Sequence, residues 1–417
     1  MKDNGVICPM PFIQFSTTTM GNYQACCIAK QVDSMSYDNT TPMEFFNSDH
    51  MKQLRHDMAN GNKSDLYNHT CSNCITAEKL YNKSKRLESL DHYIHGKLVS
   101  DKTIMQVMKE KDTRLEPKDI DHLKMKVFGN ICNLTCVMCY PGTSSALAAE
   151  MKRFGTLPTR FKGKTVQNSY KTIDKEKLYA DLDVICPVIR EFEIIGGEPL
   201  MMKDALIMIE WIISKGYSKN MEFKIITNAT ITNMEFLNLM KYFKKATFLV
   251  SLDGFGKKDE YIRTGTIWEE KVENIKNMIY AGIDISWSNT IQLLNVGYLN
   301  EIVSFVTSLQ NDHPGKNIQN PHMNNILTNP IKFTSNNIPP HIASIYLDKY
   351  KGLDLANTET HINTLRNRSN LITLDDTDAE LLEAMKTYRW YDEKRGTCLL
   401  DEWPEFENYY SAVGRQV

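Results

Sequence analysis

The chain has 417 residues, of which 42% are hydrophobic and 24% charged, and its formal net charge is −2. This composition is typical of a globular protein and excludes collagen-like, fibrous and wholly disordered chains. A nearly neutral chain has no overall basic field with which to attract nucleic acid or an anionic membrane. No apolar run reaches the roughly 18 residues of a membrane span, and the N-terminus leads into no signal-peptide core. We therefore expect a cytoplasmic protein without nucleic-acid or membrane partners.

The ten cysteines are unevenly distributed along the chain. Eight lie within the first 139 residues, whereas Cys186 and Cys398 stand apart. A disulfide framework is unusual in a chain of this length that has no secretion signal. Clustered cysteines in a cytosolic protein more often ligate a metal or take part in redox chemistry.

The N-terminal part shows little regular periodicity. Residues 11–18 and 23–29 predict two strands of a hairpin, joined by a glycine turn. Thr41 followed by a proline predicts the start of a helix, and a second helix is expected over residues 78–90. The charged stretch at 109–118 contains a proline and is predicted to be a linker.

From about residue 122, short apolar runs alternate with helical patterns. Strands are predicted at residues 123–128, 191–195, 223–227, 247–252, 284–291 and 323–327. Helices are clearest at residues 204–214, 233–243, 269–280 and 299–309. Six strand-plus-helix units imply a parallel sheet with crossover helices. Because six is short of eight, the pattern favours an α/β fold with a partial (β/α)6 TIM-like barrel.

The changes in pattern divide the chain into three predicted parts. Residues 1–115 form a small N-terminal α+β module, residues 116–330 form the barrel, and residues 331–417 form a mainly helical C-terminal extension.

Three cysteines follow directly on the first predicted barrel strand. Cys132, Cys136 and Cys139 have the spacing Cys-x3-Cys-x2-Cys. Three thiolates on one short loop can hold three irons of a [4Fe–4S] cube and leave the fourth iron open to a substrate. A structural zinc would need a fourth ligand, and none is supplied nearby. The loop follows the carboxyl end of a strand, which in a barrel faces the active-site mouth.

This spacing resembles the signature of the radical S-adenosylmethionine (radical SAM) enzymes. Gly196, Gly197 and Glu198, after the second predicted strand, resemble the family's GGE motif. There the glycines permit close backbone approach, and the carboxylate can bind the methionine ammonium of SAM.

Other segments match the family more loosely. Arg263 resembles an arginine that can pair with the methionine carboxylate, although an ordinary surface arginine is an equal alternative. Met138 replaces the aromatic residue that is common before the third cysteine, and it can still pack on adenine. The resemblance thus implies further cofactor contacts at Met138, Asn228, Ser251, Asp253 and Arg263.

Four further cysteines resemble an auxiliary [4Fe–4S] module of the SPASM or twitch type: Cys8, Cys26, Cys71 and Cys74. Neighbouring strand residues face opposite sides, so Cys26 and Cys27 cannot easily both ligate. The count of residues from the glycine turn favours Cys26. Four thiolates would close such a cluster, which suits electron transfer or structural support better than substrate binding.

Two alternatives compete for these thiols. Cys71 and Cys74 could bind zinc together with His69 and either Cys8 or Cys26. Alternatively, Cys71 and Cys74 could form a redox pair, although no thioredoxin-like context surrounds them.

The module comes before the barrel, an order associated with one group of twitch-domain radical SAM proteins. Glu78 and residues 84–86 look like that group, as do residues 392–395 and 403–405 near the C-terminus.

The resemblance implies an enzyme that reductively cleaves SAM to a 5′-deoxyadenosyl radical and abstracts hydrogen from a substrate. A peptide or protein substrate leads, with a small sugar or amino-cyclitol as the alternative. The external reductant would be a flavodoxin or ferredoxin. Cys186 and Cys398 are weak candidates for donating a hydrogen atom, since lone thiols are more often simply buried. The opposing hypothesis is a non-catalytic iron–sulfur or zinc protein that serves in electron transfer or interaction.

Overall fold

The computed structural model describes residues 5–93, 106, 108, 114–126, 128–161, 168–171, 173–323, 325–351, 358–370 and 377–414. The strands are β1 (Gln14–Thr17), β2 (Asn22–Gln24), β3 (Gln31–Ser36), β4 (His122–Met125), β5 (Glu191–Ile194), β6 (Glu222–Thr227), β7 (Lys245–Ser251) and β8 (Asp284–Ser288). Their order in the sheet is β3-β2-β1-β4-β5-β6-β7-β8.

The N-terminal helices are α1 (Met10–Ile13), α2 (Pro42–Phe46), α3 (Asp49–Asn60), α4 (Asp65–Thr70), α5 (Ser72–Tyr81) and α6 (Lys85–Tyr93). The central helices are α8 (Ser145–Arg153), α9 (Lys175–Ile185), α10 (Lys203–Ser214), α11 (Met234–Leu239), α12 (Lys257–Ile262), α13 (Trp268–Tyr280) and α14 (Leu299–Asp312). The C-terminal helices are α15 (Pro340–Lys349), α16 (Glu359–Ser369), α17 (Thr377–Arg395) and α18 (Glu407–Ala412).

Two compact units make up the chain. The first comprises Met1–Cys132, Pro141–Thr227 and Asn233–Phe248, and the second comprises Asn133–Tyr140, Asn228–Thr232 and Leu249–Val417. The first six strands belong to the first unit, β8 belongs to the second, and β7 has residues in both. The boundaries predicted at residues 115 and 330 stay predictions.

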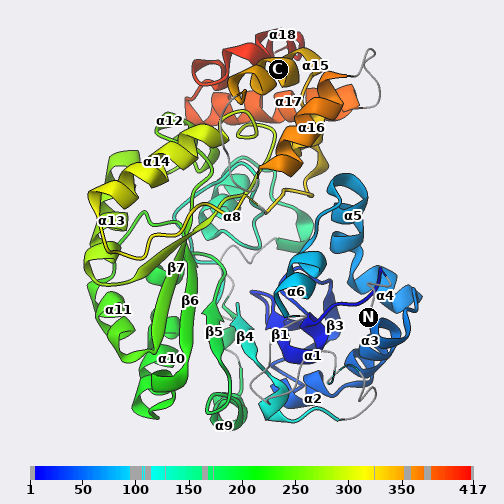
Figure 1. Cartoon of the computed structure of the whole chain (residues 1–417), viewed down its shortest axis with the longest axis vertical. Coiled ribbons are helices and arrows are strands. Elements are labelled where there is room, and N and C mark those ends of the chain that lie inside the picture. Colours follow the sequence, from blue (N-terminus) through cyan, green and yellow to red (C-terminus); the bar gives the residue numbers. More distant parts are fainter. Residues whose placement is uncertain are drawn as a thin grey trace. The chain divides into compact units, whose positions relative to one another are not determined.

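The predicted N-terminal hairpin is confirmed in part, because β1 starts later than predicted and β2 ends at Gln24, so that Cys26 and Cys27 follow the strand instead of lying on it. β1 and β2 pair antiparallel through Ser16↔Gln24 and Thr17↔Tyr23. Residues before Gln14 form α1 instead of strand, because Pro11 supplies the fixed φ that suits the first turn of a helix. β1 also pairs in parallel with β4, so the hairpin extends the barrel sheet, as Figure 1 shows for the blue and cyan strands.

One predicted strand is wrong. In the described residues of 323–327 the chain forms only an isolated bridge, between Ile291 and Ile326. The segment is rich in asparagine and lies between Pro321 and Pro330, which disfavour a regular strand.

The single helix predicted over 78–90 is in fact two helices. α5 ends at Tyr81, where the left-handed backbone of the following Asn82 (φ 52°) stops the helix, and α6 starts at Lys85. Asparagine tolerates this conformation better than most residues do. Of the predicted linker, residues 109–113 lie outside the described residues.

Side chains alternate between the two faces of the sheet in the first unit. One face is apolar and packs on α11: the Phe223 ring lies 6.1 Å from Phe192 and 6.1 Å from Phe236, measured between ring centroids. The other face is polar and carries His122 and Lys124 of β4 opposite Glu191 and Glu193 of β5. Two hydrophobic faces would be expected for a parallel sheet that helices cover on both sides. The polar face therefore distinguishes this sheet.

The C-terminal region is helical, as predicted. Within the second unit, Trp403 is fully buried and donates from Nε1 to the Leu294 carbonyl at 2.6 Å. Tyr298 and Tyr346 both donate their hydroxyls to Glu405, at 2.6 and 2.5 Å. The fold is thus mixed α/β with an eight-stranded sheet and a helical C-terminal region, which agrees with a partial TIM-type barrel. In the part of the chain that the structure describes, no helix is both long and apolar enough to cross a membrane.

Candidate functional site

The cysteine loop begins at the end of the first unit. The backbone N–H of Cys132 donates to Ser145 Oγ at 3.1 Å, and Ser145 Oγ donates back to the Cys132 carbonyl at 3.2 Å. The backbone N–H of Ser145 also bonds to the Asn130 carbonyl at 2.7 Å. The start of α8 therefore fixes the backbone at Cys132. No motif singles out Ser145, because serine is common at the start of a helix.

The GGE motif lies against this same stretch of backbone. Gly197 has φ +49°, and a Cβ built there would lie 2.2 Å from the Ile131 carbonyl oxygen. The backbone N–H of Glu198 donates to that oxygen at 2.6 Å. Only glycine permits this approach. The structure therefore brings Gly196, Gly197 and Glu198 next to the residue that precedes Cys132.

Glu198 is fully buried. Its Oε1 accepts hydrogen bonds from the Leu200 N–H at 3.1 Å and from Thr227 Oγ1 at 2.8 Å. A buried carboxylate is costly unless it is hydrogen-bonded, and these donors hold it in one orientation. Thr227 ends β6, so the next strand of the sheet helps to position the motif.

The rest of the cysteine loop lies in the second unit. The N–H of Thr135 donates to the Thr264 carbonyl at 2.9 Å, and the N–H of Val137 donates to the Ile262 carbonyl at 3.0 Å. The two segments run antiparallel, which places Cys136 opposite Arg263. A hydrogen bond from Cys139 and the nearby Arg263 charge lower the pKa of Cys136, against the effect of burial.

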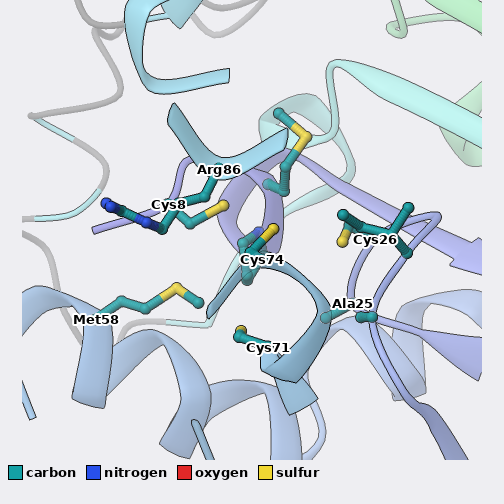
Figure 2. A pocket seen from close by; sticks show the side chains of 11 residues that line it. Cys8, Ala25, Cys26, Met58, Cys71, Cys74 and Arg86 are labelled. Atoms are coloured by element: carbon teal, nitrogen blue, oxygen red, sulfur yellow. The ribbon is translucent and has the colours of Figure 1, made fainter. Parts of the chain in front are cut away.

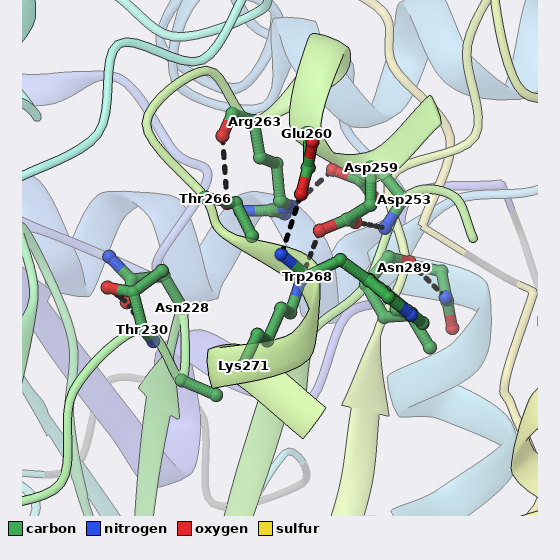
Figure 3. A network of polar contacts seen from close by, with 12 residues as sticks. Asn228, Thr230, Asp253, Asp259, Glu260, Arg263, Thr266, Trp268, Lys271 and Asn289 are labelled. Atoms are coloured by element: carbon green, nitrogen blue, oxygen red, sulfur yellow. Dashed lines mark hydrogen bonds and ion pairs between the residues drawn. The ribbon is translucent and has the colours of Figure 1, made fainter. Parts of the chain in front are cut away.

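Arg263 belongs to a buried network of charges, shown in Figure 3. Its Nη2 lies 2.7 Å from Asp253 Oδ2. The backbone N–H of Asp253 donates to Asp259 Oδ1 at 3.0 Å, and Asp259 Oδ2 lies 2.5 Å from Lys271 Nζ. The Arg263 side chain is only 10% exposed, so it is not a surface arginine. The structure thus pairs Asp253 and Arg263, two of the predicted cofactor residues, with each other.

Asn228 is held by two residues that the sequence did not single out. Its Nδ2 donates to Asn133 Oδ1 at 3.0 Å, and its Oδ1 accepts from the Thr230 N–H at 2.9 Å. Asn133 follows Cys132 directly in the chain and also donates to Thr230 Oγ1 at 2.8 Å. Ser251 is buried, and Met138 is half-buried. A single asparagine belongs to no recognisable motif, so the sequence alone does not identify Asn133 as a site residue.

The four predicted auxiliary cysteines line one pocket in the first unit (Figure 2). They come from separate segments: before α1, after β2, between α4 and α5, and within α5. Neither Cys27 nor His69 is among the lining residues, whereas Cys8, Cys26, Cys71 and Cys74 all are.

Two cysteine sulfur atoms of this pocket, those of Cys8 and Cys74, accept hydrogen bonds from backbone N–H groups. Burial raises the pKa of Cys8 and Cys74, while backbone bonds from Met10 and Arg86 respectively lower it. Arg86 lines the pocket and is fixed by a bidentate pair with Glu78, with both bonds at 2.8 Å. N–H donors of this kind stabilise thiolate sulfur, which is the form that ligates iron.

A second cluster of possible metal ligands lies on the polar face of the sheet. Ligand atoms of His122, Glu191 and Glu193 all lie within 4.8 Å of one another. However, Lys124 lies 2.6 Å from Glu193, and Lys224 forms an ion pair with Glu191. Because each carboxylate already has a cationic partner, we interpret this cluster as an ion-pair network rather than a metal site.

The two isolated cysteines differ in their surroundings. Cys186 is 1% exposed at the C-terminus of α9, before β5, whereas the GGE motif follows β5. Burial raises the pKa of Cys186 to about 12. It therefore lies at the opposite end of β5 from the motif. Cys398 is half-buried in the C-terminal region.

Comparison with known proteins agrees with the motif. Residues 126–305 match the family model described as the Radical SAM superfamily. No curated protein matches the chain.

Two solved structures show limited similarity. Native anSMEcpe with bound AdoMet is 15% identical, with a TM-score of 0.37, over 55% of this chain and 59% of that chain. Streptococcus suis SuiB bound to precursor peptide SuiA is 13% identical, with a TM-score of 0.29, over 72% of this chain and 60% of that chain. This chain thus spans about three fifths of the length of either protein. The residues that match the family model have the cysteine loop near their start and include the GGE motif.

Proposed function

We propose that Cys132, Cys136 and Cys139 hold a [4Fe–4S] cluster whose open iron binds SAM, and that the chain uses this pair to abstract hydrogen from a substrate. When bound, the cluster and SAM supply the 5′-deoxyadenosyl radical. The observation that carries this proposal is the packing of the GGE motif on Ile131, where only Gly197 permits the contact.

The chain's own residues have separate tasks in this proposal. Glu198, held by Leu200 and Thr227, binds the methionine ammonium. Arg263 lies opposite Cys136 and favours its thiolate, the form that ligates iron. The remaining proposed contacts with SAM come from Gly196, Met138, Asn228, Ser251 and Asp253.

The auxiliary [4Fe–4S] cluster belongs to the proposal as well, with Cys8, Cys26, Cys71 and Cys74 as its ligands. The shared pocket and the N–H donors around its sulfurs support this ligand set. The absence of His69 from the described lining makes the zinc alternative less favourable. We assign residues 1–115 to this auxiliary module.

The proposed substrate is a peptide or protein, because the cysteine pattern of the chain resembles that of twitch and SPASM enzymes, which usually modify peptides or proteins. A small sugar or amino-cyclitol is the alternative. The proposed electron donor is a flavodoxin or ferredoxin, and the proposed location is the cytoplasm. A buried, hydrogen-bonded Glu198 favours an enzyme over a pure electron carrier, since a carrier has no need to bind SAM.

The test is anaerobic reconstitution with iron and sulfide, followed by iron counting and assay of SAM cleavage. We expect about eight irons per chain and formation of 5′-deoxyadenosine in the presence of reductant, even without substrate. Cys132→Ala should abolish the cleavage, and Cys186→Ala should not. If the reduced wild-type protein forms no 5′-deoxyadenosine, the enzyme proposal is wrong.

The same preparation tests the auxiliary ligands through a matched pair of neighbours. Cys26→Ala should lower the iron content to about four per chain, whereas Cys27→Ala should leave it near eight, because only Cys26 lines the pocket. The opposite result would assign the ligand to Cys27.

A further inference from the structure

The C-terminal region reaches the segment that supports Cys136. This segment, Tyr261 to Thr264, is here named the support segment. The backbone carbonyl of Thr264 in this segment accepts a hydrogen bond from the Thr135 N–H at 2.9 Å. The Thr264 hydroxyl donates to the Tyr261 carbonyl at 2.8 Å and accepts from Arg395 Nη1 at 3.0 Å. Arg395 is thus two hydrogen bonds away from the backbone that flanks Cys136.

Arg395 is itself held in place at the end of α17. Its guanidinium carbon lies 3.8 Å from the centre of the Tyr391 ring, a stacking contact that suits arginine. The turn that follows is closed by Asp392, which accepts from Thr397 Oγ1 at 2.6 Å and from the Leu399 N–H at 2.8 Å. Asp392 is buried. These contacts hold the guanidinium of Arg395 in the position from which it donates to Thr264.

The same C-terminal region also packs on the other end of the support segment. The Tyr261 ring lies 5.3 Å from the ring of Trp403 and 6.4 Å from that of Tyr388. Trp403 and Tyr388 are both fully buried. The segment is therefore held by aromatic packing at Tyr261 and by a charged donor at Thr264.

We propose that Arg395 is a positioning residue for the cysteine loop. By holding the Thr264 hydroxyl, it fixes the carbonyl that binds the Thr135 N–H, and through it the position of Cys136. This inference rests on the proposed function and extends the cofactor site to the C-terminal region. A displacement of about 1 Å at a reacting centre can cost about a hundredfold in rate, so small shifts at Cys136 matter.

The test compares three variants of the reconstituted full chain. Arg395→Met keeps the apolar stem but removes the donors, Arg395→Lys keeps a charged donor, and Arg389→Met is the control. Arg389 lies on the same helix and donates to the Tyr410 carbonyl at 3.1 Å, and among the described residues it has no hydrogen bond or ion pair with the support segment. Two quantities are measured: the change that SAM causes in the electron paramagnetic resonance spectrum of the reduced protein, and the rate of SAM cleavage without substrate.

We expect Arg395→Met to alter the SAM-dependent spectral change and to lower the cleavage rate by about ten- to a hundredfold. Arg395→Lys should recover most of both. Arg389→Met should keep the wild-type spectrum and rate, even if its thermal stability falls. A merely structural arginine would shift stability alone, so wild-type spectrum and rate in Arg395→Met would overturn the inference. Equal losses in Arg389→Met would overturn it as well.

A further variant keeps the inference testable if Arg395→Met does not fold. Thr264→Val removes the hydroxyl that Arg395 binds while keeping the shape of the side chain, and it should reproduce the spectral change. An unaltered spectrum in Thr264→Val would count against the inference. If the wild-type protein gives neither a SAM-dependent spectrum nor cleavage, the proposed function itself fails.

Discussion

Gly197 has no side chain, and this allows the GGE motif to pack against the backbone before Cys132. Its positive φ alone would be tolerated by several residues at a modest cost, but a Cβ would meet backbone atoms on two sides, at 2.2 Å from the Ile131 oxygen and 2.8 Å from the Asn130 carbonyl carbon. Backbone cannot rotate away as a flexible side chain can. An added methyl group must therefore displace the residues directly before Cys132.

We expect Gly197→Ala to lower SAM cleavage by at least tenfold, because the shift reaches the cysteine loop. The measurement is 5′-deoxyadenosine formation by the reduced protein. The matched control is Gly216→Ala, since Gly216 also has positive φ (+77°) but nothing lies within 4 Å of its Cβ position. If both variants lose activity equally, backbone strain rather than the contact with Ile131 is responsible.

Site residues that belong to a motif with fixed spacing could be predicted from the sequence. Site residues that act through individual hydrogen bonds could not. The three cysteines and the two glycines stand at spacings that chemistry requires, so the sequence displays them. Ser145 and Thr264 act through hydrogen bonds with distant backbone, and Asn133 acts through hydrogen bonds with the side chains of Asn228 and Thr230. Such bonds depend on where the fold places them, and no local spacing encodes them.

At the scale of elements, α8 begins with two adjacent serines that have different tasks. Ser144 caps the helix and accepts the Leu147 N–H at 3.1 Å, whereas Ser145 binds the backbone of Cys132. The two residues therefore separate the stability of the helix from the position of the loop.

We expect Ser144→Ala and Ser145→Ala each to lower the free energy of unfolding by about 1 kcal/mol. Only Ser145→Ala should also raise the KM for SAM, because only Ser145 holds Cys132. Denaturant titration measures the first effect and a SAM-cleavage assay the second. An equal change of KM in both variants would contradict the assignment.

Strands and helices were predictable where their local pattern was strong. β5 and β6 are short and alternate charged with apolar residues, and they lie where expected. The described residues of 323–327 include apolar ones as well but form only a bridge, because a strand needs a neighbour that pairs along its length. The break between α5 and α6 depends on one asparagine, which propensity alone does not distinguish from a helical residue.

Across the whole molecule, stability depends on the buried charges of the polar sheet face. Burial lowers the pKa of His122, but the carboxylates of Glu191 and Glu193 outweigh it and raise the pKa to about 9, from an ordinary value of 6.5. Lys124 and the protonated His122 together hold the pKa of Glu193 down at about 2, although burial acts in the opposite direction. Protonated His122 therefore stabilises the folded state.

The sign of the pH dependence follows from the raised pKa. The contribution of His122 is fully present below pH 6.5 and is lost as the pH rises through about 9. It amounts to about 3 kcal/mol at most. We expect the difference in unfolding free energy between wild type and His122→Gln to shrink between pH 6.5 and 9.5. A difference that stays constant over this range would contradict the network.

The membership of β1 in the barrel sheet could not be predicted from the sequence. A hairpin reveals its own turn, but the parallel pairing of β1 with β4 joins residues more than a hundred positions apart. No local pattern specifies such a partner.

This pairing has a consequence for any shortened form of the protein. β1 covers the backbone donors and acceptors along one side of β4, through Gln14↔His122, Phe15↔Leu123 and Ser16↔Lys124. A chain that began near residue 116 would leave that side of β4 open. Unpaired edges of this kind recruit strands from other molecules. We therefore expect the N-terminal hairpin to protect this edge of β4 from pairing with strands of other molecules.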